Sequence, residues 1–127
     1  MHTTVKPTDA ELEILRLIWQ NGPSTVRQIN DLLNEKKTVG YTTTLKLLQI
    51  MAQKGIVRAD KSDRSHVYTA LYKEDETQHQ LLDQLLQAAF GGSAKKLVMQ
   101  ALGNGKTSRS ELEEIKSLIS KLERGES

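Results

Sequence analysis

Short hydrogen-bonding side chains and a cation gather in one stretch near the middle of the chain. They are Tyr41, Thr42, Thr43, Thr44 and Lys46. Consecutive threonines are poor helix formers, but on a helix that enters a DNA groove their hydroxyls reach phosphates or base edges and their methyl groups meet thymine methyls. We therefore predict that Thr43, Thr44 and Lys46 contact bases or nearby phosphates. An ordinary helix start is the alternative.

A second set of polar side chains suits contacts with a phosphate backbone. The start of a helix offers free amides and a positive dipole end, which favour a phosphate. The residues predicted to contact the DNA backbone are Ser24, Thr25, Arg27, Gln28 and Tyr41, although Arg27 equally fits a solvated surface position. Arg64, in a turn, is a candidate for a minor-groove or phosphate contact. The nearby His66 is either a further contact or a structural residue.

The charge distribution supports a polyanionic partner. The net charge is only +2, but residues 1–73 carry +4 and residues 74–127 carry −2. Between Lys36 and Lys73 there are eight basic and two acidic residues. Such a bias favours a surface that faces nucleic acid, while a solvated charged face is the alternative.

The sequence gives little support for a catalytic function. The chain has no cysteine, which excludes disulfides, thiolate metal sites and a thiol nucleophile. The histidines, His2, His66 and His79, lack the paired spacing of a metal site. The segment 103–107 resembles the end of a phosphate-binding loop, but Gln100 stands where that loop needs a glycine. We therefore expect no enzyme activity, no metal and no cofactor.

Helix and strand signals in the sequence predict the elements that carry the candidate DNA contacts and the order of those elements. Thr8 and Thr25 each stand three residues before Glu11 or Gln28, the spacing of a capping box that begins a helix. A third helix is predicted over 41–54 and ends at Gly55. Residues 56–61 and 66–72 alternate as strands around a turn at 62–65. Three helices followed by a hairpin are typical of a winged helix-turn-helix, predicted here over residues 1–73.

The remaining residues, 74–127, predict three amphipathic helices that form a dimerisation region. They cover 76–90, a short helix after Ser93 up to Leu102, and a last helix after Ser108. About 50 residues cannot bury three apolar stripes alone, so a second copy of the chain is expected to cover them. The residues predicted to form the dimer interface are Leu82, Leu85, Leu86, Leu97, Val98, Leu112, Ile115, Ile119 and Leu122. The fold class is thus mainly α with a small β-hairpin wing.

Several ordered motifs resemble the penicillinase-repressor family, the BlaI, MecI and CopY type. They are Thr8-Asp9-Ala10-Glu11-Leu12-Glu13-Ile14-Leu15 with Trp19, Tyr41-Thr42-Thr43-Thr44-Leu45, Lys54-Gly55-Ile56-Val57, His66-Val67-Tyr68, and the break Phe90-Gly91-Gly92-Ser93. The resemblance covers nearly the whole chain. It implies a homodimeric winged-helix repressor that binds double-stranded DNA at a pseudo-palindromic operator, often with TACA-like half-sites.

Two departures from the family pattern bear on how such a repressor would be released. Copper-responsive members carry a C-terminal cysteine cluster, which this chain lacks. In antibiotic-responsive members a membrane sensor-protease system leads to cleavage after the Gly-Gly break, typically at an Asn-Phe bond. The matching bond here is Gln100-Ala101, so cleavage there is a hypothesis and the inducing signal stays open.

Taken together, these features predict a sequence-specific DNA-binding repressor that acts as a homodimer. No apolar stretch approaches the roughly 18 residues of a membrane span, so a cytoplasmic protein without membrane insertion is expected. Winged helices also serve as scaffolds, which leaves a protein-interaction module without sequence-specific DNA binding as the alternative. A nucleotide binder that uses Lys106 and Thr107 is a weaker one.

Overall fold

The computed structural model describes residues 5–126, and His2 lies outside them. The chain divides into two compact units, Met1–Leu81 and Leu82–Ser127. The boundary between the two units falls inside the fourth helix, beyond the division predicted between residues 73 and 74. That predicted division stays a prediction. Among the described residues, no helix is long and apolar enough to cross a membrane.

The first unit contains the three helices predicted from the sequence. They are α1 (Asp9–Asn21), α2 (Val26–Leu33) and α3 (Tyr41–Gln53). Both predicted capping boxes are present, Thr8 with Glu11 and Thr25 with Gln28. α1 ends at Gly22, whose φ of 81° is a conformation that L side chains rarely adopt.

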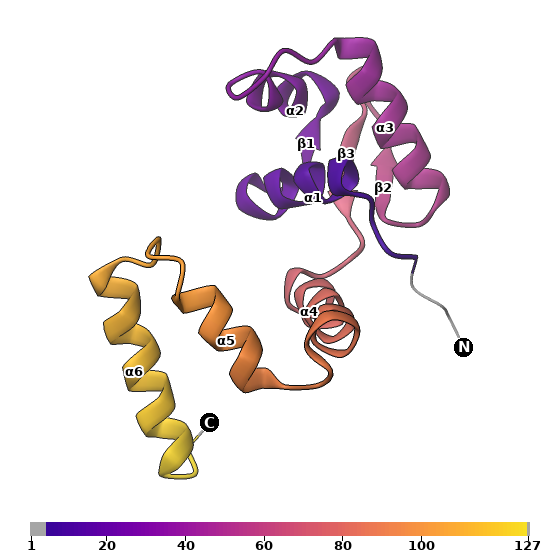
Figure 1. Cartoon of the computed structure of the whole chain (residues 1–127). Coiled ribbons are helices and arrows are strands. Elements are labelled where there is room, and N and C mark those ends of the chain that lie inside the picture. The colour runs from indigo at the N-terminus through magenta and orange to yellow at the C-terminus, as the bar shows by residue number, and fades with distance from the viewer. Residues whose placement is uncertain (1–4, 127) are drawn as a thin grey trace. The chain divides into compact units, whose positions relative to one another are not determined.

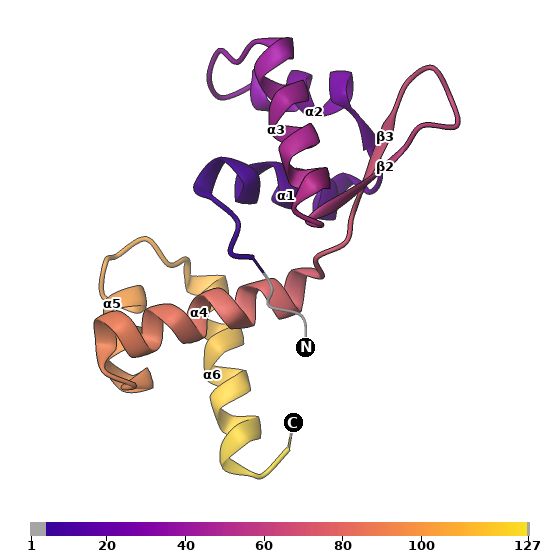
Figure 2. The same ribbon diagram turned by 90° about the vertical axis from the view of Figure 1, so that its right-hand side faces the viewer.

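A three-stranded antiparallel sheet completes the first unit (Figure 1). Its strands are β1 (Ser24–Thr25), β2 (Val57–Asp60) and β3 (Val67–Ala70), in the order β1-β3-β2. The β2–β3 hairpin confirms the predicted wing, and the loop between its strands projects from the unit (Figure 2). β1 was not predicted. It is only two residues long and coincides with the cap of α2.

The core of this unit is aliphatic and lies between the three helices and the sheet. Tyr68 of β3 is the one buried aromatic ring in the described core, while Trp19 packs at its edge and donates its Nε1–H to the Tyr72 carbonyl at 2.9 Å. Glu11 of α1 is buried as well, and its Oε2 lies 2.8 Å from the Lys54 ammonium just after α3. The buried apolar residues are Ile14, Leu15, Ile18, Val26, Ile29, Leu33, Leu48, Met51, Ile56, Val57 and Tyr68.

The C-terminal region contains the three predicted helices. α4 (Glu74–Phe90) begins two residues before its predicted start, and α5 (Ala94–Leu102) and α6 (Arg109–Glu123) follow their predicted serine caps. No residue from 82 to 126 is buried. These helices therefore carry apolar side chains without an apolar core of their own, in contrast to the first unit.

Candidate nucleic-acid interface

One face of α3 is buried and the opposite face is polar and exposed. Thr44, Leu48 and Met51 point into the core. Helical spacing places the exposed side chains of a polar stripe on the other side: Thr42, Lys46, Gln49 and Gln53. Thr43 is also exposed, on the flank of this stripe. The stripe can donate and accept hydrogen bonds along three turns of a helix that fits a major groove.

Thr44 has a structural role, and the prediction that it contacts a base is wrong. Its side chain is 0% exposed. Its Oγ1 accepts a hydrogen bond from Asn30 Nδ2 at 2.8 Å and donates one to the Gly40 carbonyl at 3.4 Å. The residue stands four before Leu48 and seven before Met51, so helical periodicity turns it inward.

Two asparagines, Asn30 of α2 and Asn34 at its end, form hydrogen bonds to the segment that connects α2 and α3. Asn30 is also the residue that bonds Thr44. Asn30 Nδ2 also donates to the Val39 carbonyl at 3.1 Å. Asn34 donates from Nδ2 to the same carbonyl at 2.9 Å and accepts from the Val39 amide at 3.0 Å. These bonds fix the connection and therefore the position at which α3 begins.

Thr44→Val is expected to lower the free energy of unfolding by about 1–2 kcal/mol, because it leaves a buried Asn30 amide hydrogen without its acceptor. Urea denaturation measures the loss. The exposed Thr42→Val is the matched control and should stay within about 0.5 kcal/mol of the parent. A Thr44→Val protein as stable as the parent would contradict the structural role.

The start of α2 brings one cation to the interface, while the side chain of one predicted residue there is buried. The hydroxyl of Ser24 donates to the Gly22 carbonyl at 2.8 Å, so its side chain does not face the interface, and a phosphate contact at this position stays a prediction. Thr25 and Gln28 bond each other's backbone amides in the capping box. Arg27 is exposed, and its Cζ lies 5.0 Å from the centre of the Tyr41 ring. This cation–π contact holds the guanidinium beside the start of α3.

Two hollows lie between α3 and the hairpin, and they share Gln49 and His66 as lining residues. One, of about 320 Å³, also includes Arg27 and Tyr41 together with Arg64 of the wing. The other, of about 420 Å³, lies between the end of α3 and the strands. We call the two together the α3–wing valley. Its lining residues are Thr25, Val26, Arg27, Tyr41, Leu45, Gln49, Ala52, Gln53, Ala59, Lys61, Arg64, Ser65, His66 and Tyr68.

The α3–wing valley thus unites residues that the sequence predicted separately. Thr25, Arg27, Tyr41, Arg64 and His66 all line it, although they come from three segments of the chain. Gln49 was missed. Its signal was the continuation of the polar stripe from Thr42 and Lys46, one turn further along the helix.

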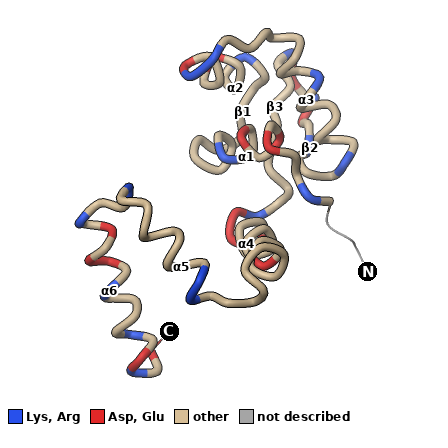
Figure 3. The backbone as a smooth tube through the Cα atoms, viewed as in Figure 1, with Lys and Arg blue, Asp and Glu red and all other residues tan. Residues whose placement is uncertain are grey.

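The charges of the valley suit a polyanion. Its charged lining residues are Arg27, Lys61 and Arg64, and no Asp or Glu lines it among the described residues. Figure 3 shows Lys and Arg along α3 and the hairpin. The nearby Asp60 instead accepts from the Ser62 amide at 3.0 Å, a bond that holds the pKa of its carboxyl below the usual range. Asp63 accepts from the Arg64 amide.

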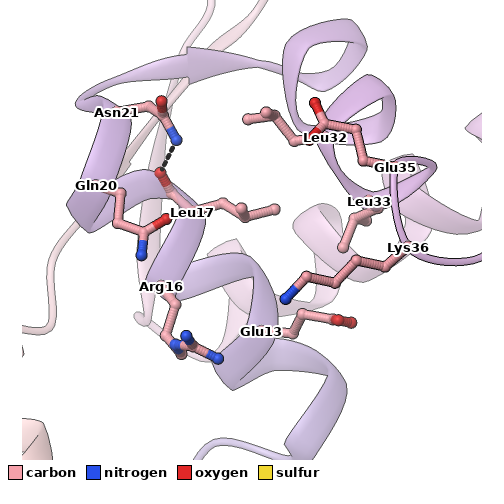
Figure 4. Close-up of a pocket in the computed structure, with 9 residues that line it drawn as sticks. All are labelled: Glu13, Arg16, Leu17, Gln20, Asn21, Leu32, Leu33, Glu35 and Lys36. Atoms are coloured by element: carbon pink, nitrogen blue, oxygen red, sulfur yellow. Dashed lines mark hydrogen bonds between the residues drawn. The ribbon is translucent and has the colours of Figure 1, made fainter. Parts of the chain in front are cut away.

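A further cavity, of about 260 Å³, lies between α1 and the end of α2 (Figure 4). Leu17, Leu32 and Leu33 give it apolar walls. Its charged lining residues are two carboxylates and two cations: Glu13, Glu35, Arg16 and Lys36. Since these charges balance, the cavity does not share the preference of the valley for an anionic ligand. Among the described residues, no group of three or more His, Asp or Glu side chains could hold a metal ion.

Comparison with known proteins decides the family. The family model described as penicillinase repressor matches residues 7–121. The chain belongs to the penicillinase repressor family. This finding confirms the resemblance seen in the sequence motifs. The family is one of transcriptional repressors and not of enzymes.

Curated relatives of this penicillinase repressor family member cover much of its length. The transcriptional regulator BlaI of Mycobacterium tuberculosis is 34% identical over 87 residues, which are 67% of this chain and 63% of that protein. The chain therefore spans less than two thirds of that relative. The penicillinase repressor of Staphylococcus aureus is 24% identical over 110 residues, which are 87% of each chain.

Two solved structures of BlaI share the fold of the first unit. The DNA-binding domain of the repressor BlaI aligns with a TM-score of 0.52 and 26% identity, over 60% of this chain and 93% of that domain. The monomeric form of Bacillus licheniformis BlaI, solved with the blaP half-operator, aligns with a TM-score of 0.51 and 26% identity over the same shares. The fold is therefore that of the winged-helix DNA-binding domain of this repressor family, as predicted.

The residues predicted for dimerisation all lie on α4, α5 and α6. Leu82, Leu85, Val98, Leu112, Ile119 and Leu122 are exposed, whereas Leu86, Leu97 and Ile115 are half-buried. α6 adds Leu118, 55% exposed, which was not predicted. Gln100 and Ala101, the hypothetical cleavage position, are both exposed on the last turns of α5. Their part in release remains a prediction.

Proposed function

We propose that this chain is a sequence-specific DNA-binding transcriptional repressor. The α3–wing valley carries the proposal, because it joins cations from α2 and the wing to the polar stripe of α3 without an intervening acid. Thr42, Thr43 and Lys46 would meet base edges in the major groove. Arg27, Tyr41 and Arg64 would contact the backbone that borders it, and Arg64 could enter the minor groove.

We further propose that two copies bind a pseudo-palindromic operator as a homodimer. The support is the exposed apolar surface of α5 and α6, which contrasts with the aliphatic core of the first unit. Large exposed apolar patches are uncommon on isolated soluble domains and mark interaction sites. Joining two half-site contacts in one complex raises affinity without any new contact to DNA.

Release of the operator would follow loss of that interface. Hydrolysis of the Gln100–Ala101 bond, by the protease of a membrane sensor system or another enzyme, would separate α6 from the DNA-binding unit. The two residues are exposed in the chain considered alone. Each unit would then bind its half-site independently and more weakly.

Two substitutions distinguish base reading from phosphate contact. Arg64→Ala is expected to weaken binding to all sequences alike and to reduce the slope of log K against log salt by about 1. Thr42→Ala should instead lower the discrimination between operator and random DNA by about 1–2 kcal/mol. Fluorescence anisotropy over a salt series, with selected and random duplexes, measures both effects.

Matched controls lie outside the valley. Arg16→Ala on α1 and Thr38→Ala before α3 alter exposed residues of the same types and should change neither quantity. If Thr42→Ala weakened operator and random DNA equally, Thr42 would not read bases. An unchanged salt slope for Arg64→Ala would remove the wing from the interface.

A further inference from the structure

His66 occupies a distinctive place in the α3–wing valley. It lies directly before β3, is half-buried, and lines both hollows together with Gln49 of α3. A side chain at this place stands between the helix proposed to enter the major groove and the wing beside it. If α3 enters the major groove as proposed, one sugar–phosphate strand of the duplex would pass along the valley, near the imidazole.

The charged groups that share the valley with His66 are all cations. α2 contributes Arg27, and the hairpin contributes Lys61 and Arg64. From α3 come Tyr41 and the neutral Gln49 and Gln53. The remaining titratable neighbour is Tyr68, where burial, followed by the nearby Tyr41, raises the pKa of the phenol further above neutrality.

The two carboxylates of the hairpin do not offset these cations within the valley. Asp60 is bonded to the Ser62 amide at 3.0 Å and Asp63 to the Arg64 amide at 3.3 Å. Neither lines the valley. The charged side chains that line the valley around the His66 ring are therefore cations, which attract a phosphate group.

We propose that His66 binds a phosphodiester of the DNA backbone as the imidazolium, so that operator binding takes up a proton. This inference rests on the proposed function. A phosphate that enters the valley brings negative charge to a place lined by three cations and favours the protonated ring. Imidazole is the side chain that changes charge between about pH 5 and pH 8, so the linkage acts in the physiological range.

The sign of the effect follows from linkage. Because the complex holds more protons than the free components, affinity rises as pH falls. Kd for one half-site should therefore fall by up to about tenfold between pH 8 and pH 6. Thr25, Gln49 and Ser65, the other polar residues near the ring, have no charge to gain over this range.

The three histidines of the chain allow a sharp test by anisotropy titration with a half-site duplex at constant ionic strength. The double variant H2Q/H79Q keeps His66 alone and should retain the full pH dependence. H66Q should bind at both pH 8 and pH 6 with the weaker affinity that the parent shows at pH 8. H66R carries a permanent charge and should bind at both pH values with the tighter affinity that the parent shows at pH 6. Circular dichroism at each pH verifies that the variants are folded.

Two results would overturn the inference. One is a parent Kd that does not change between pH 8 and pH 6, and the other is an H66Q variant that keeps the parent's pH dependence. Failure of the proposed function looks different, since the parent would then bind random and selected duplexes equally at every pH. Sequence-specific binding that is independent of pH would leave the repressor proposal intact and remove only the role of His66 as a proton-linked contact.

Discussion

Replacing Leu112 and Ile119 together with aspartate is expected to produce a monomer that binds operator DNA on the order of a hundredfold more weakly. The two side chains stand seven residues apart on one face of α6 and are 37% and 48% exposed in the single chain. In the proposed dimer the partner covers them, and unpaired carboxylates buried there would be costly. The DNA-binding unit, whose core lies elsewhere, should remain folded.

A matched pair of substitutions on the same helix provides the control. Ser110→Asp with Ser117→Asp adds the same charge at the same spacing, on the face of α6 away from Leu112. Sedimentation equilibrium at micromolar concentration and operator titration should show a dimer with parental affinity for the serine pair. A chain that ends at Gln100 should behave as the Leu112 and Ile119 variant does. A parent protein that sediments as a monomer would contradict the homodimer.

Lys54→Met is expected to reduce the free energy of unfolding by about 2–3 kcal/mol. The substitution leaves the Glu11 carboxylate, 2% exposed, without the ammonium 2.8 Å away. Removing one partner of a fully buried pair costs about 3–5 kcal/mol, and the Lys54 side chain is 33% exposed, so part of that cost is screened by solvent. The pair joins the start of α1 to the end of α3, so its loss acts on the whole unit.

An exposed ion pair of the same chain is the control for urea denaturation. Lys37 Nζ lies 3.6 Å from Glu13 Oε1, with side chains that are 65% and 35% exposed. Lys37→Met should therefore change the free energy of unfolding by less than about 0.5 kcal/mol. Equal effects of the two substitutions would show that burial of Glu11 adds nothing to the Lys54 interaction.

The effect of Lys54→Met should also depend on pH in a defined direction. Burial alone would raise the pKa of the Glu11 carboxyl, but the Lys54 ammonium and hydrogen bonds from the Thr8 amide and hydroxyl together hold the pKa below its ordinary 4.5. A lowered folded-state pKa contributes stability above the ordinary value, and this contribution is lost as pH falls through the folded-state pKa. The difference between parent and variant should therefore be largest near neutral pH and shrink as pH falls through the range in which the Glu11 carboxyl becomes protonated.

Local signals were sufficient to predict most of the architecture. The caps at Thr8 and Thr25 depend on hydrogen bonds within a few residues of chain, so their sequence spacing alone places the starts of α1 and α2. The hairpin follows from alternation around a polar turn. β1 was not predicted because its two residues form a strand only by pairing with β3, which lies more than forty residues away in the chain.

The errors in the candidate site have a common physical origin. Thr44 was predicted to contact bases because threonine is polar, yet its phase with Leu48 and Met51 turns it into the core, where Asn30 satisfies its hydroxyl. The same phase places Gln49 on the exposed stripe. Residue type thus suggested the chemistry, while helical periodicity decided which residues could perform it.

Tertiary contacts explain what no local pattern could predict. The pairing of Glu11 with Lys54 and the cation–π contact of Arg27 with Tyr41 join residues from different elements. The α3–wing valley likewise exists only once the hairpin folds beside α3. The sequence therefore predicted that Arg27, Arg64 and His66 would contact DNA but could not predict that they line one continuous surface.

Selection of bound fragments from randomly sheared genomic DNA, followed by sequencing, tests the repressor proposal most directly. The expected result is a two-fold-symmetric consensus bound by a dimer. Affinity for it should fall steeply with salt but remain at least about a thousandfold above that for random DNA. Weak recovery of fragments without any shared sequence would contradict the proposal, and the winged helix would then be a protein-interaction module with a basic surface.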